Sequence, residues 1–111
     1  MLFVLILLLI PATATAKDFT EQNNLITQIG RATALGQLCG RHGIRDKQLV
    51  IYLKPFGLKL KDPVIVDWID GQKWQALNTE FETLPRESAC AMADVLYGPT
   101  GSVLPGLFEG D

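Results

Sequence analysis

The chain has 111 residues and a formal net charge of −2, from ten Lys and Arg against twelve Asp and Glu. Both signs are scattered along it, so it lacks the concentrated positive field that binding a nucleic-acid backbone requires, and we expect no nucleic-acid partner. The length suits one small domain with a modest core.

The N-terminus has the pattern of an export signal. Residues 2 to 10 are apolar without interruption, and a run of small residues ending in Ala14-Thr15-Ala16 precedes the first charged residue, Lys17. Signal peptidases cleave after such A-x-A patterns, so we expect residues 1–16 to be removed and residues 17–111 to form a single globular domain. The alternative, an uncleaved anchor, needs about 17 to 25 apolar residues. We therefore predict a periplasmic or secreted protein with no transmembrane segment after signal removal.

A first helix is predicted after the signal, because apolar residues recur there at steps of three and four. Thr20 or Asn23 could cap its start, and Gly40 suits the position after its end because glycine tolerates positive φ. Gly30 and Gly36 lower its helix propensity. The expected buried face comprises Leu25, Ile26, Ile29, Ala32, Leu35, Leu38 and Cys39.

A turn at residues 40–43 leads to a second predicted helix, in which Leu49 and Leu53 lie one turn apart. This helix should stop near Lys54, because Pro55 would clash with the preceding turn. The β-branched and aromatic content of residues 49–53 also permits a strand.

Asp62 and Pro63 form a favourable start for a third helix, with a carboxylate cap and a proline at the first position. Helical spacing predicts an inward face made of Val64, Trp68, Gly71, Trp74, Leu77 and Phe81. The rival is a β-hairpin over residues 64–77, since Asp70-Gly71 is a favoured two-residue hairpin turn. We favour the helix, because residues 74–78 show little strand alternation.

A last helix is predicted after Pro85, with apolar residues at helical spacing up to Tyr97 and Gly98-Pro99 at its end. Cys90 lies on its inward flank. An exported compartment keeps cysteine pairs oxidised, so we predict a disulfide between Cys39 and Cys90, with two free thiols or a metal pair as alternatives. Residues 98–111 are expected to form an extended tail.

Two groups of residues could carry chemistry. Cys39 and His42 could supply two zinc ligands or an activated thiolate, but a structural zinc site needs four ligands and a nucleophilic cysteine must be reduced. We therefore expect no catalytic residue, no metal and no cofactor.

The second group pairs carboxylates with aromatic rings, as sugar-binding sites do, although carboxylates one helical turn apart do not by themselves flank a glycosidic bond. It consists of Asp67, Trp68, Asp70 and Trp74. The competing interpretation places both tryptophans in the core and Asp70 beside Lys73.

Two further stretches could bind a partner. Positive residues gather in the middle third and acidic residues follow, which favours either a polar partner or an ordinary solvated surface. They are Arg41, His42, Arg45, Lys47, Lys54, Lys59 and Lys61, then Glu80, Glu82 and Glu87. In the tail, Leu104, Leu107 and Phe108 either fold back over the core or dock on another protein.

Together these patterns predict a mostly α-helical domain of three or four helices with one disulfide, or an α+β version with the hairpin near residues 64–77. We expect a small exported accessory or binding protein without catalytic activity that docks on a protein partner. The alternative is a saccharide-binding protein or small glycoside hydrolase using the Asp67, Asp70, Trp68 and Trp74 group.

Overall fold

The computed structural model describes residues 2–40 and 43–109, with side chains from residue 19 onward. Within these residues the chain forms four α-helices and one 3-10 helix and no strand, apart from an isolated antiparallel bridge between Ile44 and Phe108. The mostly helical prediction is confirmed, and the hairpin at residues 64–77 does not form. The elements are α1 (Leu2–Cys39), α2 (Asp46–Leu53), η1 (Lys54–Phe56), α3 (Pro63–Asn78) and α4 (Arg86–Tyr97).

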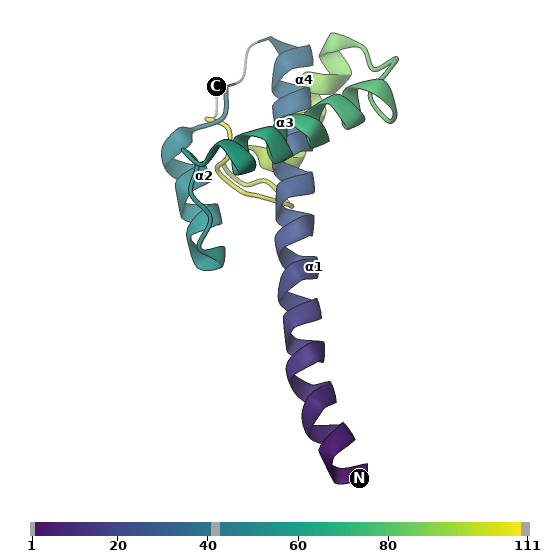
Figure 1. The fold of residues 1–111 in the computed structure, drawn as a ribbon. Helices are drawn as coiled ribbons and strands as arrows, with labels where there is room; N and C mark the ends of the chain where they lie inside the picture. The colour runs from purple at the N-terminus through teal and green to yellow at the C-terminus, as the bar shows by residue number, and fades with distance from the viewer. Residues whose placement is uncertain (1, 41–42, 110–111) are drawn as a thin grey trace.

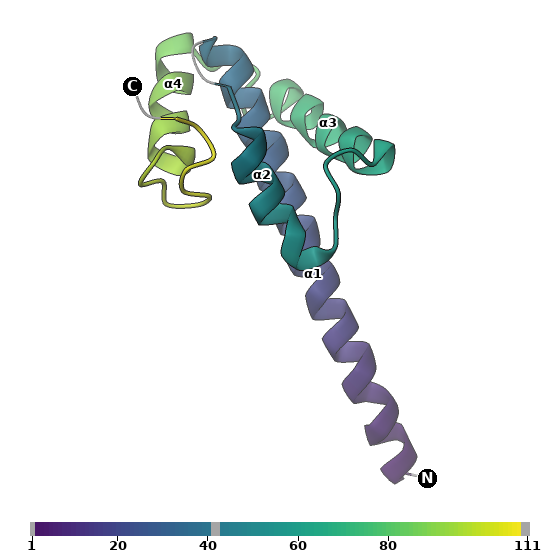
Figure 2. The same ribbon diagram turned by 90° about the vertical axis from the view of Figure 1, so that its left-hand side faces the viewer.

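Helix α1 is the long element on which α3 and α4 pack. Its 38 residues span about 57 Å, most of the 60 Å long axis. Helices α3 and α4 pack on opposite sides of its C-terminal half, while its N-terminal part projects beyond the other elements (Figures 1 and 2). We expected the helix to start at Thr20 or Asn23, which is wrong in this structure. The leucines and alanines before Thr20 favour helix, and a cap acts only where a helix begins.

The core is built around the predicted face of α1, of which Ile26, Ile29 and Leu35 are completely buried. Helix α3 approaches α1 closely at Gly30. A methyl group there would collide with the Gln72 side chain and lie 2.9 Å from the backbone of Gln72 and Lys73. The glycine that weakens α1 as an isolated helix therefore lets α3 pack directly on its backbone.

Helix α3 turns only part of the predicted face toward the core: Trp68 and Leu77 pack against it, and Phe81, just beyond the helix, is buried. The buried residues of α3 are Ile65, Ile69 and Ala76, whereas Val64 is 69% exposed and Trp74 is 49% exposed. Placing Val64 and Trp74 inward was therefore wrong. The contact of Gln72 with Gly30 fixes the rotation of α3, because Ile65, Ile69, Gln72 and Ala76 follow one another at steps of three or four.

The predicted end of α2 and the predicted start of α3 are confirmed. Helix α2 ends at Leu53, before Pro55, so the strand alternative for residues 49–53 is wrong. Asp62 caps α3 by accepting a hydrogen bond from the Val64 amide at 3.0 Å. This bond satisfies one of the amide hydrogens that a helix start leaves without an internal partner.

A disulfide joins Cys39, the last residue of α1, to Cys90 in α4, as predicted, with the two Cα atoms 4.8 Å apart. The Arg86 guanidinium donates to the Cys39 carbonyl oxygen at 2.9 Å, so a second link crosses the same helix junction. The bridge closes a loop that holds α2 and α3, which restricts the unfolded chain.

Residues 98–109, which we expected to be extended, form turns that fold back on α4. Three carbonyl groups at the end of α4 accept hydrogen bonds from this segment, from Ser102 to Val95, from Leu104 to Leu96 and from Phe108 to Tyr97. Carbonyls at a helix C-terminus lack partners within the helix, so the segment completes α4 as well as covering it.

Candidate binding groove

Helix α2 is anchored on one side and open on the other. Leu49 and Leu53 point into the core, with exposures of 6% and 0%, and the Tyr52 hydroxyl donates to the Pro105 carbonyl at 2.7 Å. The opposite side carries Lys47 and Val50, three residues apart and therefore neighbours on the helix surface. Val50 is 48% exposed.

After η1 the chain reverses direction at Gly57, which has the left-handed φ of 69° that glycine adopts without strain. The Leu58 amide donates to the Leu53 carbonyl at 3.3 Å, which holds the returning chain against the end of α2. From Leu58 to Lys61 leucine and lysine alternate, and the two leucines are half-buried while the two lysines are exposed. The local turn therefore lays apolar side chains beside α2 and positive ones outside them.

Between α2 and this return segment lies an open groove of about 700 Å³, within the range usual for ligand sites. Its floor is apolar and its rim is positively charged, and we call it the lysine-rimmed groove. It is lined by Asp46, Lys47, Val50, Lys54, Gly57, Leu58, Lys59, Leu60 and Lys61.

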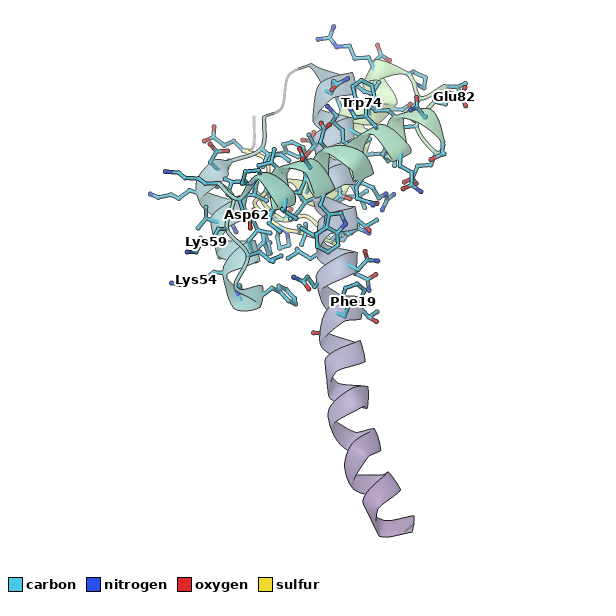
Figure 3. The ribbon with its side chains drawn as sticks, in the orientation of Figure 1. Phe19, Lys54, Lys59, Asp62, Trp74 and Glu82 are labelled. Carbon is cyan, nitrogen blue, oxygen red and sulfur yellow. A yellow bond between two sulfur atoms is a disulfide. The ribbon has the colours of Figure 1, made fainter. Side chains whose placement is uncertain are left out.

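The charges of the groove are unbalanced, with four lysines against the single carboxylate of Asp46. Among the residues whose side chains are described, no ion pair joins any of these lysines to a carboxylate. Lys73 on α3, in contrast, lies 3.1 Å from Asp70. Figure 3 shows Lys54 and Lys59 near the start of α3 and Glu82 beyond its other end. Positive charge is therefore concentrated at one end of a chain that is negative overall.

The carboxylate and tryptophan group on α3 is only partly assembled. Asp67, Asp70 and Trp74 share the exposed face of the helix, whereas Trp68 is half-buried and packs against the core. The Lys73 ammonium lies 4.6 Å from the centre of the Trp74 ring and also pairs with Asp70. The predicted Asp70 to Lys73 contact is confirmed, and a saccharide role for this face stays a prediction.

The remaining predicted site residues do not join the groove. Arg41 and His42 lie outside the described residues, and the disulfide makes the Cys39 thiolate unavailable. Within the described part of the chain, no group of three or more His, Cys, Asp and Glu is placed to hold a metal ion. Leu107 and Phe108 are fully buried by the rest of the chain, and Leu104 is nearly so. Of the two alternatives for the tail, the structure therefore has the one in which it folds back over the core.

A polar network joins α1 to α4 and to the segment that follows α3. The buried Tyr97 hydroxyl donates to Gln28 Oε1 at 2.6 Å, and Arg31 donates to the same oxygen at 3.1 Å. Arg31 also binds both carboxylate oxygens of Glu80, at 2.7 and 3.2 Å. Burial raises the pKa of Tyr97 above its ordinary value of 10.0, with Arg31 opposing and Glu80 adding to the rise. The phenol is therefore a stable proton donor that ties α1 to α4.

Sequence reasoning missed the apolar half of the groove, Val50, Leu58 and Leu60, together with Asp46 and Gly57. Two signals could have revealed it. Residues 58–61 alternate Leu-Lys-Leu-Lys, and Lys47, Val50 and Lys54 fall at helical steps of three and four. Both patterns place an apolar residue between lysines.

Within the part of the chain whose side chains are described, no helix is long and apolar enough to cross a membrane. Comparisons of the chain with protein-family models, with curated proteins and with solved structures find no match.

Proposed function

We propose that this protein is a small exported binding protein without catalytic activity, and that it docks on another protein through the lysine-rimmed groove. The observation that carries the proposal is the groove itself, in which exposed apolar side chains are surrounded by four lysines without an ion-pair partner among the described residues. Apolar surface in a concave site with a few charged groups is the usual composition of a recognition site.

Export is supported by the disulfide, since such bonds form and persist in oxidising compartments. The apolar run and A-x-A pattern before Lys17 supply the matching signal peptide. Mass spectrometry of the protein isolated from its native host tests this part. We expect a periplasmic or secreted chain that begins at Lys17 and carries no free thiol. An intact N-terminus with two reactive thiols in the cytosolic fraction would contradict it.

A binding role is supported over catalysis by the chemistry around the groove. The two cysteine sulfurs are joined to each other, so neither is a nucleophile. Asp46 is the single carboxylate of the groove lining, whereas glycoside hydrolysis generally uses a pair of carboxylates. Lysines in this arrangement bind anions.

Photo-crosslinking tests protein docking directly. We would replace Val50 with a photo-crosslinking residue in the native host and compare it with the same replacement at Val95, which is 65% exposed on α4. We expect a discrete protein adduct from position 50 and none from position 95. Equal labelling at both positions, or none at either, would refute docking through the groove.

A saccharide ligand remains a second proposal, favoured by the half-exposed Trp74 ring beside Asp67 and Asp70 on α3. Titrating tryptophan fluorescence with cell-wall oligosaccharides tests it, with Trp74→Ala as the control that removes the ring. A saturable change that this control abolishes would support the proposal, and turnover lost in Asp67→Asn and Asp70→Asn would indicate hydrolysis. An unchanged spectrum would exclude it.

A further inference from the structure

The lysine-rimmed groove also indicates the chemistry of its occupant. Resting on the proposed docking function, we propose that the groove takes an acidic peptide segment of a partner protein, in which carboxylates flank one or two apolar side chains. The charge, the apolar lining and the shape of the groove support this occupant.

Charge complementarity selects an acidic ligand. Four lysines and one aspartate line the groove, and the ion pairs of Asp70, Glu80 and Glu109 among the described residues all lie outside it. Facing charges of opposite sign speed association and exclude partners of the wrong sign. A basic or neutral peptide would leave these lysines unmatched.

The apolar floor selects a ligand that also carries apolar side chains. Val50 from α2 and Leu58 and Leu60 from the return segment lie between the lysines. Ligand side chains that cover them would remove apolar surface from water, at about 25 cal/mol per Å². A purely ionic ligand such as phosphate would leave this floor exposed.

The backbone of the return segment offers additional donors. The amides of Lys59, Leu60 and Lys61 donate to no backbone carbonyl among the described residues. A peptide can accept hydrogen bonds from such amides through its own carbonyl groups, as it does when it lies along an open backbone edge.

Shape and length favour a peptide over a lipid. The eight residues of α2 span about 12 Å, whereas an acyl chain that fills one leaflet spans about 15 Å. A membrane surface is flat, and the lysines here surround a hollow. The remaining carboxylates of this negatively charged chain would also be repelled by an anionic bilayer.

A direct binding measurement tests the proposal. The probe is a short fluorescent peptide that alternates glutamate with leucine, and its anisotropy is titrated with the full chain. Control peptides replace glutamate by lysine or leucine by serine. We expect saturable binding of the acidic leucine peptide alone, weakened by added salt because the contacts are ionic and exposed.

Matched variants locate the binding. The Lys54→Gln and Lys59→Gln double variant should lower the affinity for the peptide about tenfold. Lys73→Gln, outside the groove, should not change that affinity. Val50→Ser should weaken it about threefold. Ile51→Ser is the control, because Ile51 is similarly exposed on the same helix but does not line the groove. Far-ultraviolet circular dichroism confirms that each variant is folded.

The outcomes separate this proposal from the docking function. Groove-dependent binding of the acidic peptide, which also competes with the crosslink at position 50, supports it. A specific crosslink without peptide binding refutes the acidic segment and leaves docking intact. Groove-dependent binding to phosphatidylglycerol vesicles, or self-association in sedimentation that the lysine variants abolish, would overturn it in favour of a lipid or a second copy.

Discussion

Residues 57–61 and residues 98–109 are both irregular segments that follow a helix and reverse on a glycine in the left-handed conformation, Gly57 at φ 69° and Gly106 at φ 79°. Their outcomes differ. The later segment buries Leu107 and Phe108 completely and bonds to the end of α4, whereas the earlier one leaves its leucines half-exposed and its lysines without ion pairs among the described residues. The comparison separates a segment that completes the core from one whose surface is available for binding.

Truncating one apolar side chain in the later segment and one in the groove should give very different losses of stability. Phe108→Ala should lower the free energy of unfolding by about 3 to 5 kcal/mol, because it empties a fully buried site that contacts Tyr97 edge-on. Val50→Ala in the groove should change it by less than about 0.5 kcal/mol. Urea unfolding measures both. Equal losses would mean that the groove belongs to the core.

Loss of the disulfide should affect the fold more than the groove. The Cys39→Ser and Cys90→Ser double variant should lose about 2 to 4 kcal/mol, because the bridge closes a loop over a separation of 51 residues. Thermal unfolding with and without a reducing agent checks the value, since reduced wild type should match the variant. Peptide affinity well below the melting temperature should stay within about twofold, and a complete loss would show that the groove depends on the bridge.

Adding one methyl group at Gly30 should disrupt the close packing of α3 on α1. Gly30→Ala should cost about 1 to 3 kcal/mol, because the added methyl collides with Gln72 and must push α3 away. Gly71→Ala on the exposed face of α3 is the control, since nothing lies within 4 Å of its added methyl. That control should stabilise α3 slightly through helix propensity. The reverse order of stabilities would contradict the packing described here.

The stability that the Tyr97 hydroxyl contributes should depend on pH. The pKa of Tyr97 is raised in the folded state, so its hydroxyl contributes fully below pH 10 and its contribution is lost as pH rises through the folded pKa. Tyr97→Phe should cost about 1 kcal/mol at neutral pH, from loss of the hydrogen bond to Gln28. The difference between wild type and variant should shrink above pH 10. A constant difference would contradict ionisation of Tyr97 as its cause.

Local patterns predicted the elements that depend on nearby residues. The periodicity of Ile26, Ile29 and Leu35 identified the buried face of α1, and Asp62 and Pro63 identified the start of α3. The parity of the two cysteines identified the disulfide. In each case the physical cause lies within one helical turn, or in the redox compartment that a disulfide requires.

Long-range contacts decided what the sequence could not predict. Two sets of apolar residues on α3 have helical spacing, and the sequence analysis chose the set that contains the large Trp74. The contact of Gln72 with Gly30 sets the rotation of α3 about its axis and leaves Trp74 half-exposed. The groove was missed for a similar reason. Its lysines are spread over residues 47–61 and meet only because Gly57 turns the chain back along α2.

The position of the covalent bridge has a consequence for handling the molecule. The bond from Cys39 to Cys90 encloses all of residues 46–61, so the whole groove lies within one covalent ring. A single protease cut after Lys59 would therefore separate no fragment until the sulfurs are reduced. Nicked and intact molecules would migrate together on a non-reducing gel, and only a reducing gel would reveal the damage.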